Sequence, residues 1–141
     1  MLAGIPAPGL PADTAAYIRR EVKSLLALSG AGFPLDSLRV QTDVKRAVRR
    51  AYYPDGLSRQ GAAALAGFYA GRERQLQAIR VPTLVIHGSD DPLVTPAAGR
   101  DVASNIPNAQ FVLIEGMGHS IAPALTTPLA DLILRNAKKK L

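Results

Sequence analysis

The feature that most constrains the fold is an apolar run at residues 83–86 (TLVI), which follows Pro82 and ends before Gly88. A short, largely β-branched run bounded by proline and glycine is typical of a strand buried on both faces, the usual setting of a parallel strand. Two carboxylates, Asp90 and Asp91, follow it at the carboxyl end of the expected strand. In open α/β sheets, that end is where ligands bind and chemistry takes place.

A second run of the same kind lies at residues 111–114 (FVLI), and a helix-length segment that starts at Thr95-Pro96 separates the two runs. Two buried-type strands joined by a helix form a β-α-β unit with parallel strands. A last amphipathic helix is expected from Thr127 onward. The sequence therefore predicts the α/β fold class, with a parallel β-α-β-α unit over residues 76–141.

Residues 1–75 are expected to form a separate helical segment, because no run of strand type separates their helical patterns. An irregular lead-in at residues 1–11, rich in proline and glycine, comes first. We expect three helices after it, the first capped by Asp13, the second by Thr42, and the third starting at Ser58 after a turn at 54–56.

Composition and charge narrow the function classes. The absence of cysteine excludes disulfides and thiolate metal sites, and no secretory signal or membrane-spanning run is visible, so we expect a cytoplasmic protein. The net charge of +6 lies in residues 1–80, which hold 12 Lys and Arg against 6 Asp and Glu. A basic module for anionic surfaces is one reading. The solvent faces of helices explain these charges more simply, and the basic segments lack the interleaved aromatic residues that single-strand binding uses, so no nucleic-acid partner is expected.

The candidate site combines the acidic loop after residue 88 with His119 in the Gly116-Met-Gly-His loop after the second run. Parallel strands place both loops at one edge of the sheet, so a carboxylate of Asp90 or Asp91 can meet His119. A carboxylate bonded to one imidazole nitrogen fixes the tautomer and leaves the other nitrogen free as a general base. The alternative is that these are ordinary loop residues at the sheet edge.

His87 lies inside the first apolar run, where a core histidine bonded to backbone is the simplest interpretation. A metal site formed by His87, Asp90, Asp91 and His119 would use acceptable ligand types. No H-x-x-x-H or comparable spacing supports it. We therefore expect neither a metal nor a cofactor.

The runs LQAIRVPTLVIHGSDDPLVTP and NIPNAQFVLIEGMGHSIAP resemble the C-terminal end of the α/β-hydrolase superfamily, where the acid and the histidine of the triad follow the last two strands. In that family the acid lies three residues after the glycine of H-G-x-x-D and the histidine belongs to G-x-G-H. The resemblance therefore implies Asp91 and His119 as catalytic residues. The stretch AYYPDGLSRQ resembles the cap of bacterial carboxylesterases similar to aclacinomycin methylesterase, which makes residues 1–75 a cap-like segment and 76–141 the C-terminal part of a hydrolase core. Ser120 and Thr95 depart from that subgroup, which has Asp after the histidine and Pro after the strand-loop valine.

The resemblance also implies a G-x-S-x-G nucleophile elbow, and this sequence contains none. Ser29 lacks the glycine two residues before it, and Ser58 is wrongly spaced and follows no strand. We expect a partial α/β-hydrolase fold whose acid and histidine serve carboxylic-ester hydrolysis, with a small-molecule ester as substrate if a complementary N-terminal hydrolase half is supplied, and no activity from the chain alone. The alternative is a non-catalytic remnant or interaction protein. The unfilled side of the first strand also predicts self-association.

Overall fold

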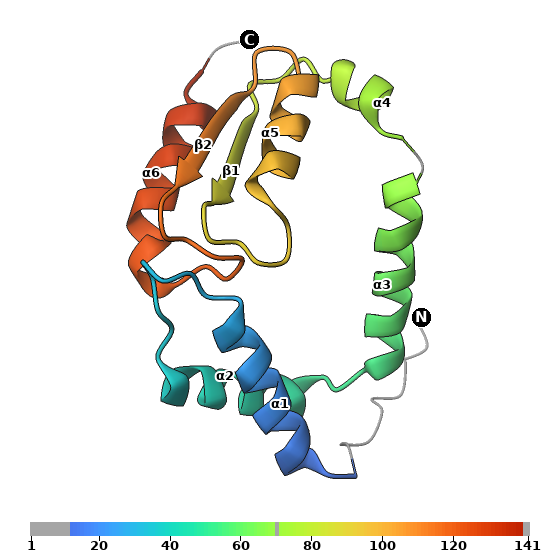
Figure 1. Cartoon of the computed structure of the whole chain (residues 1–141), viewed down its shortest axis with the longest axis vertical. Helices are drawn as coiled ribbons and strands as arrows, with labels where there is room; N and C mark the ends of the chain where they lie inside the picture. The colour runs from blue at the N-terminus through green and yellow to red at the C-terminus, as the bar shows by residue number, and fades with distance from the viewer. Residues whose placement is uncertain (1–11, 70, 140–141) are drawn as a thin grey trace, which may run out of the picture. The chain divides into compact units, whose positions relative to one another are not determined.

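The computed structural model describes residues 12–69 and 71–139, so the expected lead-in at residues 1–11 lies outside the described residues. It confirms the α/β class (Figure 1). The elements, in chain order, are α1 (Thr14–Ala27), α2 (Ser37–Arg50), α3 (Pro54–Tyr69), α4 (Glu73–Gln77), β1 (Leu84–Gly88), α5 (Pro96–Asn105), β2 (Gln110–Ile114), the short 3-10 helix η1 (Pro123–Leu125) and α6 (Thr126–Ala137).

The described chain forms two compact units. One contains residues 12–24 with Asp36–Gly71, and the other contains Leu25–Leu35 with residues 72–139. The first is helical. The second holds both strands and also takes up the eleven residues of Leu25–Leu35, which in the sequence lie inside the expected helical segment.

The helix starts of the first unit follow from their caps. Asp13 caps α1 as predicted, since its carboxylate accepts the N–H of Ala16 at 2.8 Å. The prediction that Thr42 caps the second helix is wrong, because Asp36 accepts the N–H of Arg39 at 2.6 Å and starts α2 earlier. Thr42 instead lies inside the helix.

Two further features of this unit differ from or extend the prediction. The expected turn at 54–56 is the first turn of α3, because proline suits the start of a helix, where its missing N–H leaves no bond unmade. In α2, Val40, Val44 and Val48 recur every four residues and are buried on one face. These valines are the buried apolar core among the described residues of this unit.

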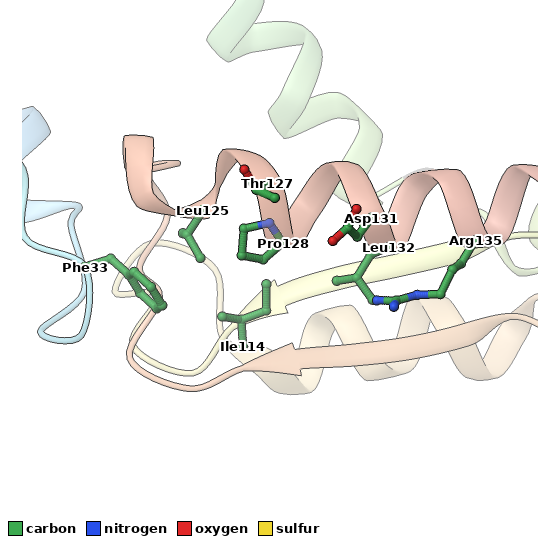
Figure 2. Close-up of a pocket in the computed structure, with 8 residues that line it drawn as sticks. All are labelled: Phe33, Ile114, Leu125, Thr127, Pro128, Asp131, Leu132 and Arg135. Carbon is green, nitrogen blue, oxygen red and sulfur yellow. The ribbon is translucent and has the colours of Figure 1, made fainter.

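The sheet of the second unit consists of β1 and β2, which pair in parallel from Leu84 opposite Gln110 to Gly88 opposite Ile114. This confirms the predicted β-α-β unit. Figures 1 and 2 show α5 and α6 on opposite faces of the two strands. The amide side chain of Asn136 donates to the carbonyl of Pro82 at 3.0 Å and ties the end of α6 to the chain just before β1.

The hydrogen bonds at the two ends of this pair fix which groups of β1 face β2. The carbonyl of Thr83 accepts the N–H of Gln110 at 2.9 Å, and the N–H of Ser89 donates to the carbonyl of Ile114 at 3.0 Å. In a parallel ladder, alternate residues bond to the same neighbour. The odd-numbered residues of β1 therefore point their backbone groups toward β2, and the even-numbered ones point theirs away.

β1 is less enclosed than its sequence predicts. Leu84, Val85 and Ile86 are half-buried, so the expectation of a strand buried on both faces is wrong. Among the described residues, β1 pairs with β2 alone, and the backbone groups of Leu84 and Ile86 face its unpaired side. Because β1 is an edge strand in this unit, solvent reaches it along its unpaired edge, and this exposure explains why its residues are only half-buried.

A buried apolar cluster of the second unit is formed at the loop that follows β2. Its buried members are Met117, Ala122 and Leu125, and Leu125 is 1% exposed. Half-buried apolar side chains surround them: Phe33, Leu35, Ile114 and Leu129. The loop that carries His119 is therefore anchored in this buried cluster.

Candidate active site

Asp91 lies in the loop after β1 and is almost completely enclosed, with a side chain that is 6% exposed. Its Oδ1 accepts the backbone N–H groups of Leu93 and Val94, each at 2.9 Å. Aspartate commonly forms such turns by bonding to N–H groups a few residues ahead. This local turn fixes the carboxylate, and the second oxygen is left to face away from the turn.

The second oxygen of Asp91 contacts the ring of His119, with Nδ1 of the imidazole 2.8 Å from Oδ2 of the carboxylate. Because an ionised carboxylate only accepts, Nδ1 carries the proton of this hydrogen bond. Neutral His119 then has its lone pair on Nε2, for which no described residue is a hydrogen-bond partner. The His119 side chain is 41% exposed, so the imidazole is accessible from solvent.

The charge state of Asp91 follows from opposing effects. Burial raises the pKa of this carboxyl, but the N–H of Val94, the ring of His119 and the N–H of Leu93 all stabilise the carboxylate. The net result is a pKa below the ordinary value of aspartate. Asp91 is therefore an anion at neutral pH, the state required to orient an imidazole.

Asp90, the competing carboxylate, has different partners. Its Oδ2 accepts the N–H of Ala31 at 3.2 Å, and its Oδ1 accepts the hydroxyl of Ser89 at 2.8 Å. Neither oxygen bonds to His119. The geometry thus brings together His119 and Asp91, and gives Asp90 a role in holding neighbouring backbone.

His87 is bonded to backbone, as its place in the apolar run predicted. Its Nε2 lies 2.9 Å from the carbonyl oxygen of Val94. Among the residues for which the structure is described, no group of three or more His, Cys, Asp or Glu side chains is arranged to hold a metal ion.

Sequence reasoning missed the 28–33 segment, which follows α1 and lies against the His119 loop. The carbonyl of Leu28 accepts the N–H of His119 at 2.8 Å and the N–H of Ser120 at 3.1 Å. The N–H of Gly32 donates to the carbonyl of Gly116 at 3.0 Å. The backbone of the histidine loop is thus held by a segment about ninety residues earlier in the sequence.

Glycine makes this approach feasible. A Cβ at Gly118 would lie 2.4 Å from both the nitrogen of Gly30 and the carbonyl oxygen of Leu28, which no side chain tolerates. Gly116 adopts φ +74°, a conformation that favours glycine. The pairs Gly30/Gly32 and Gly116/Gly118 in the sequence are the available signal, although a glycine after a helical pattern indicates a helix end equally well.

Ser29, one of the two serines weighed as a nucleophile, has its hydroxyl engaged elsewhere, and Ser120 follows His119 directly in the same described unit. The hydroxyl of Ser29 donates to the carbonyl of Leu26 at 2.7 Å, one turn back in α1. Ser120 uses its backbone N–H to bind Leu28. Neither serine hydroxyl makes a hydrogen bond to His119.

An open, mostly apolar pocket of about 420 Å³ lies between α6 and β2. Figure 2 shows Leu125, Pro128 and Leu132 pointing toward Ile114, with Phe33 at one end. Neither Asp91 nor His119 lines it. The full lining is Phe33, Ile114, Leu125, Thr127, Pro128, Asp131, Leu132 and Arg135.

Comparison with protein families gives a match over residues 1–123 to the family model described as alpha/beta hydrolase fold. Rhodomycin D methylesterase DnrP of Streptomyces peucetius is 36% identical over 67 residues, which cover 48% of this chain and 22% of that protein. The non-heme chloroperoxidase CPO-A1 of Kitasatospora aureofaciens is 44% identical over 55 residues, covering 38% of this chain and 20% of the relative. The matched regions are thus about a fifth of each relative.

A solved structure with a similar fold is a serine hydrolase involved in carbazole degradation, the CarC enzyme. The TM-score is 0.63 at 23% sequence identity, and the alignment covers 85% of this chain and 46% of CarC. At this level of identity the likeness concerns the fold. The chain corresponds to less than half of that structure.

Proposed function

Because the chain belongs to the α/β hydrolase fold family, we propose that it supplies the acid and the histidine of a Ser-His-Asp triad for the hydrolysis of small-molecule carboxylic esters. Asp91 is the acid and His119 the general base. The observation that carries the proposal is the 2.8 Å bond between Nδ1 of His119 and Oδ2 of Asp91, in a His119 side chain that is 41% exposed.

The roles follow from this hydrogen bond. Asp91 holds the imidazole in the Nδ1–H tautomer, so Nε2 takes the proton of a serine hydroxyl as the hydroxyl attacks the ester carbonyl. The resulting imidazolium is stabilised by the carboxylate and returns the proton to the leaving alcohol. Asp91 stays ionised throughout, which suits a carboxyl whose pKa is lowered.

The serine lies outside this sequence, which contains no G-x-S-x-G. Another part of a longer polypeptide or a second chain would provide it, together with the donors for the oxyanion. The esterase-type relative, a methylesterase, supports the ester class. We further propose that residues 1–75 form a cap-like segment and 76–141 the C-terminal part of the hydrolase core, a division made less simple by the packing of Leu25–Leu35 with the second unit.

Complementation tests the proposal. We expect the chain alone to hydrolyse p-nitrophenyl acetate no faster than free imidazole does. Coexpression with the G-x-S-x-G half of a related hydrolase restores activity, which His119→Ala and Asp91→Ala each reduce by about 10⁴-fold or more. Asp90→Asn, the matched control, retains it. Activity that survives His119→Ala in the complemented complex contradicts the proposal.

A non-catalytic interaction protein is the second candidate, and the unpaired side of β1 favours it. The even-numbered residues of β1 present backbone groups that a further strand can bond. Tight binding of a partner by variants that lack both His119 and Asp91, with no hydrolysis by any complemented form, would support this function over the first.

A further inference from the structure

Oδ2 of Asp91 lies between two imidazoles. Nδ1 of His119 is 2.8 Å away on one side, and Nε2 of His87 is 3.6 Å away on the other. The His87 side chain is 12% exposed and the Asp91 side chain 6%. The oxygen that orients His119 therefore also lies near a second, more enclosed histidine that the proposed reaction does not use.

The bonds of His87 fix its tautomer. Its Nε2 lies 2.9 Å from the carbonyl oxygen of Val94, and a carbonyl oxygen only accepts, so Nε2 carries a proton. The distance of 3.6 Å to Asp91 is too long for a second hydrogen bond, but the N–H of His87 still brings partial positive charge toward the carboxylate. Val94 in turn donates its own N–H to Oδ1 of Asp91.

We propose that His87 is a positioning residue for Asp91. By bonding the carbonyl of Val94 it holds the turn whose N–H groups fix Oδ1, and the same N–H lies beside Oδ2 where that oxygen binds His119. This inference rests on the proposed roles of Asp91 and His119 and adds a third side chain behind them. The chain of contacts runs from His87 through Val94 and Asp91 to His119.

The other side of the His87 ring is packed against α5. A Cβ at Gly99 would lie 2.5 Å from Nδ1 and 3.0 Å from Cγ of His87, so the helix approaches the imidazole closely because residue 99 has no side chain. Phe111 of β2 touches the same place, 3.2 Å from that Cβ position. The ring is thus held between α5 and the turn at 91–94.

Tautomer-resolved ¹H–¹⁵N NMR of the imidazole rings in the full chain at neutral pH tests the inference. In the unmodified protein we expect His87 as the Nε2–H form and His119 as the Nδ1–H form, with a hydrogen-bonded Nδ1 proton on His119. Finding His87 in the Nδ1–H form overturns the proposal, whatever any variant does.

His87→Leu removes the donor, and we expect loss or upfield shift of the His119 Nδ1 proton signal and a mixed tautomer for His119. His87→Gln places an amide N–H near the position of Nε2 and restores the signal, which mere filling of space would not do. Phe111→Leu is the control for packing against Gly99 and leaves the His119 signal in place.

The outcomes separate this inference from the function on which it rests. A folded His87→Leu protein with an unchanged His119 signal overturns the role of His87 and leaves the Asp91–His119 pair standing. An unchanged signal in Asp91→Asn removes the pair itself. If His87→Leu does not fold, Gly99→Ala displaces the ring from the α5 side, and an unchanged His119 signal in that variant also overturns the proposal.

Discussion

The carboxyl end of β1 and its unpaired side belong to the same five-residue strand but differ in how completely their polar groups are bonded. At the carboxyl end, the N–H of Ser89 bonds to Ile114, and the N–H of Asp90 bonds to Met117. Along the side, Leu84 and Ile86 have no strand to bond within the described residues. The polar groups at the carboxyl end of β1, where the candidate site lies, are hydrogen-bonded within this unit. The backbone groups along the unpaired side have no neighbouring strand among the described residues.

This difference shows which part of the candidate chemistry is local. Asp91 is fixed by the turn at residues 91–94, whose N–H groups bond to its Oδ1. His119 lies in a loop whose backbone is hydrogen-bonded to the 28–33 segment. None of these bonds needs a further strand. The second unit can therefore form the Asp91–His119 pair without a further strand.

The largest expected effect is on the core that supports the site end. Leu125→Ala should lower the free energy of unfolding by about 2–5 kcal/mol, because this side chain is 1% exposed and a cavity would remain. Urea unfolding followed by circular dichroism measures it. Leu134→Ala, at a site on α6 that is 56% exposed, should change stability by less than about 0.5 kcal/mol. Equal losses in the two variants would mean that Leu125 is not packed in a core.

The next largest effect is expected from a substitution that disturbs the packing of the 28–33 segment against the histidine loop. Gly118→Ala should cost about 1–3 kcal/mol of stability, because its Cβ would meet backbone atoms of Gly30 and Leu28 at 2.4 Å. We also expect faster amide exchange at His119 and Ser120. Gly61→Ala in α3 is the control: its Cβ meets nothing within 4 Å, so it should be neutral or stabilising. Unchanged exchange at His119 in Gly118→Ala would show that the segment does not hold the loop.

The sequence predicted much of the site because the pattern was local. The two apolar runs predicted β1 and β2, and the order of strand, loop and residue placed Asp91 and His119 at one edge. The choice of Asp91 over Asp90 came from a family motif. In the structure the difference is that Oδ1 of Asp91 bonds the turn ahead of it, while Asp90 bonds the 28–33 segment.

What the sequence could not give depends on contacts between distant segments. The bond from His119 to Leu28 joins residues 91 positions apart, and Gly30 signals a helix end equally well whether or not another backbone packs on it. The half-burial of β1 was not predicted for a related reason. An apolar run indicates that a segment forms a strand, but it does not show which neighbouring strands cover it. The prediction of the α2 cap was wrong for a local reason, because Asp36 lies before Thr42 and already caps the helix.

A smaller effect is expected on the pH dependence of stability, and it tests the contribution of Asp91. The folded pKa of Asp91 lies below its unfolded value of about 4, so its contribution to stability is fully present above that value and is lost as pH falls through the folded pKa. Asp91→Asn should remove this part of the acid dependence, whereas Asp90→Asn should leave it. Unfolding curves in urea between pH 2 and pH 7 give the comparison. Identical acid dependence in Asp91→Asn and the unmodified chain would show that the carboxylate is not stabilised by its turn and His119.

The smallest expected effect on folding, and the one that tests the open side of β1, comes from Ile86→Pro. The N–H of Ile86 faces away from β2, so proline removes no bond of the existing ladder but blocks a new strand from pairing there. The N–H of Val85 faces β2, so Val85→Pro breaks a ladder bond and should destabilise the unit far more.

We expect the unmodified chain to self-associate in sedimentation as its concentration rises, and Ile86→Pro to stay monomeric while folded. Ile86→Ala is the control for the lost side chain and should still associate. A monomer at every concentration in the unmodified chain, or association undiminished in Ile86→Pro, would mean that the unpaired side of β1 is not a binding edge, which would leave the interaction function without its supporting observation.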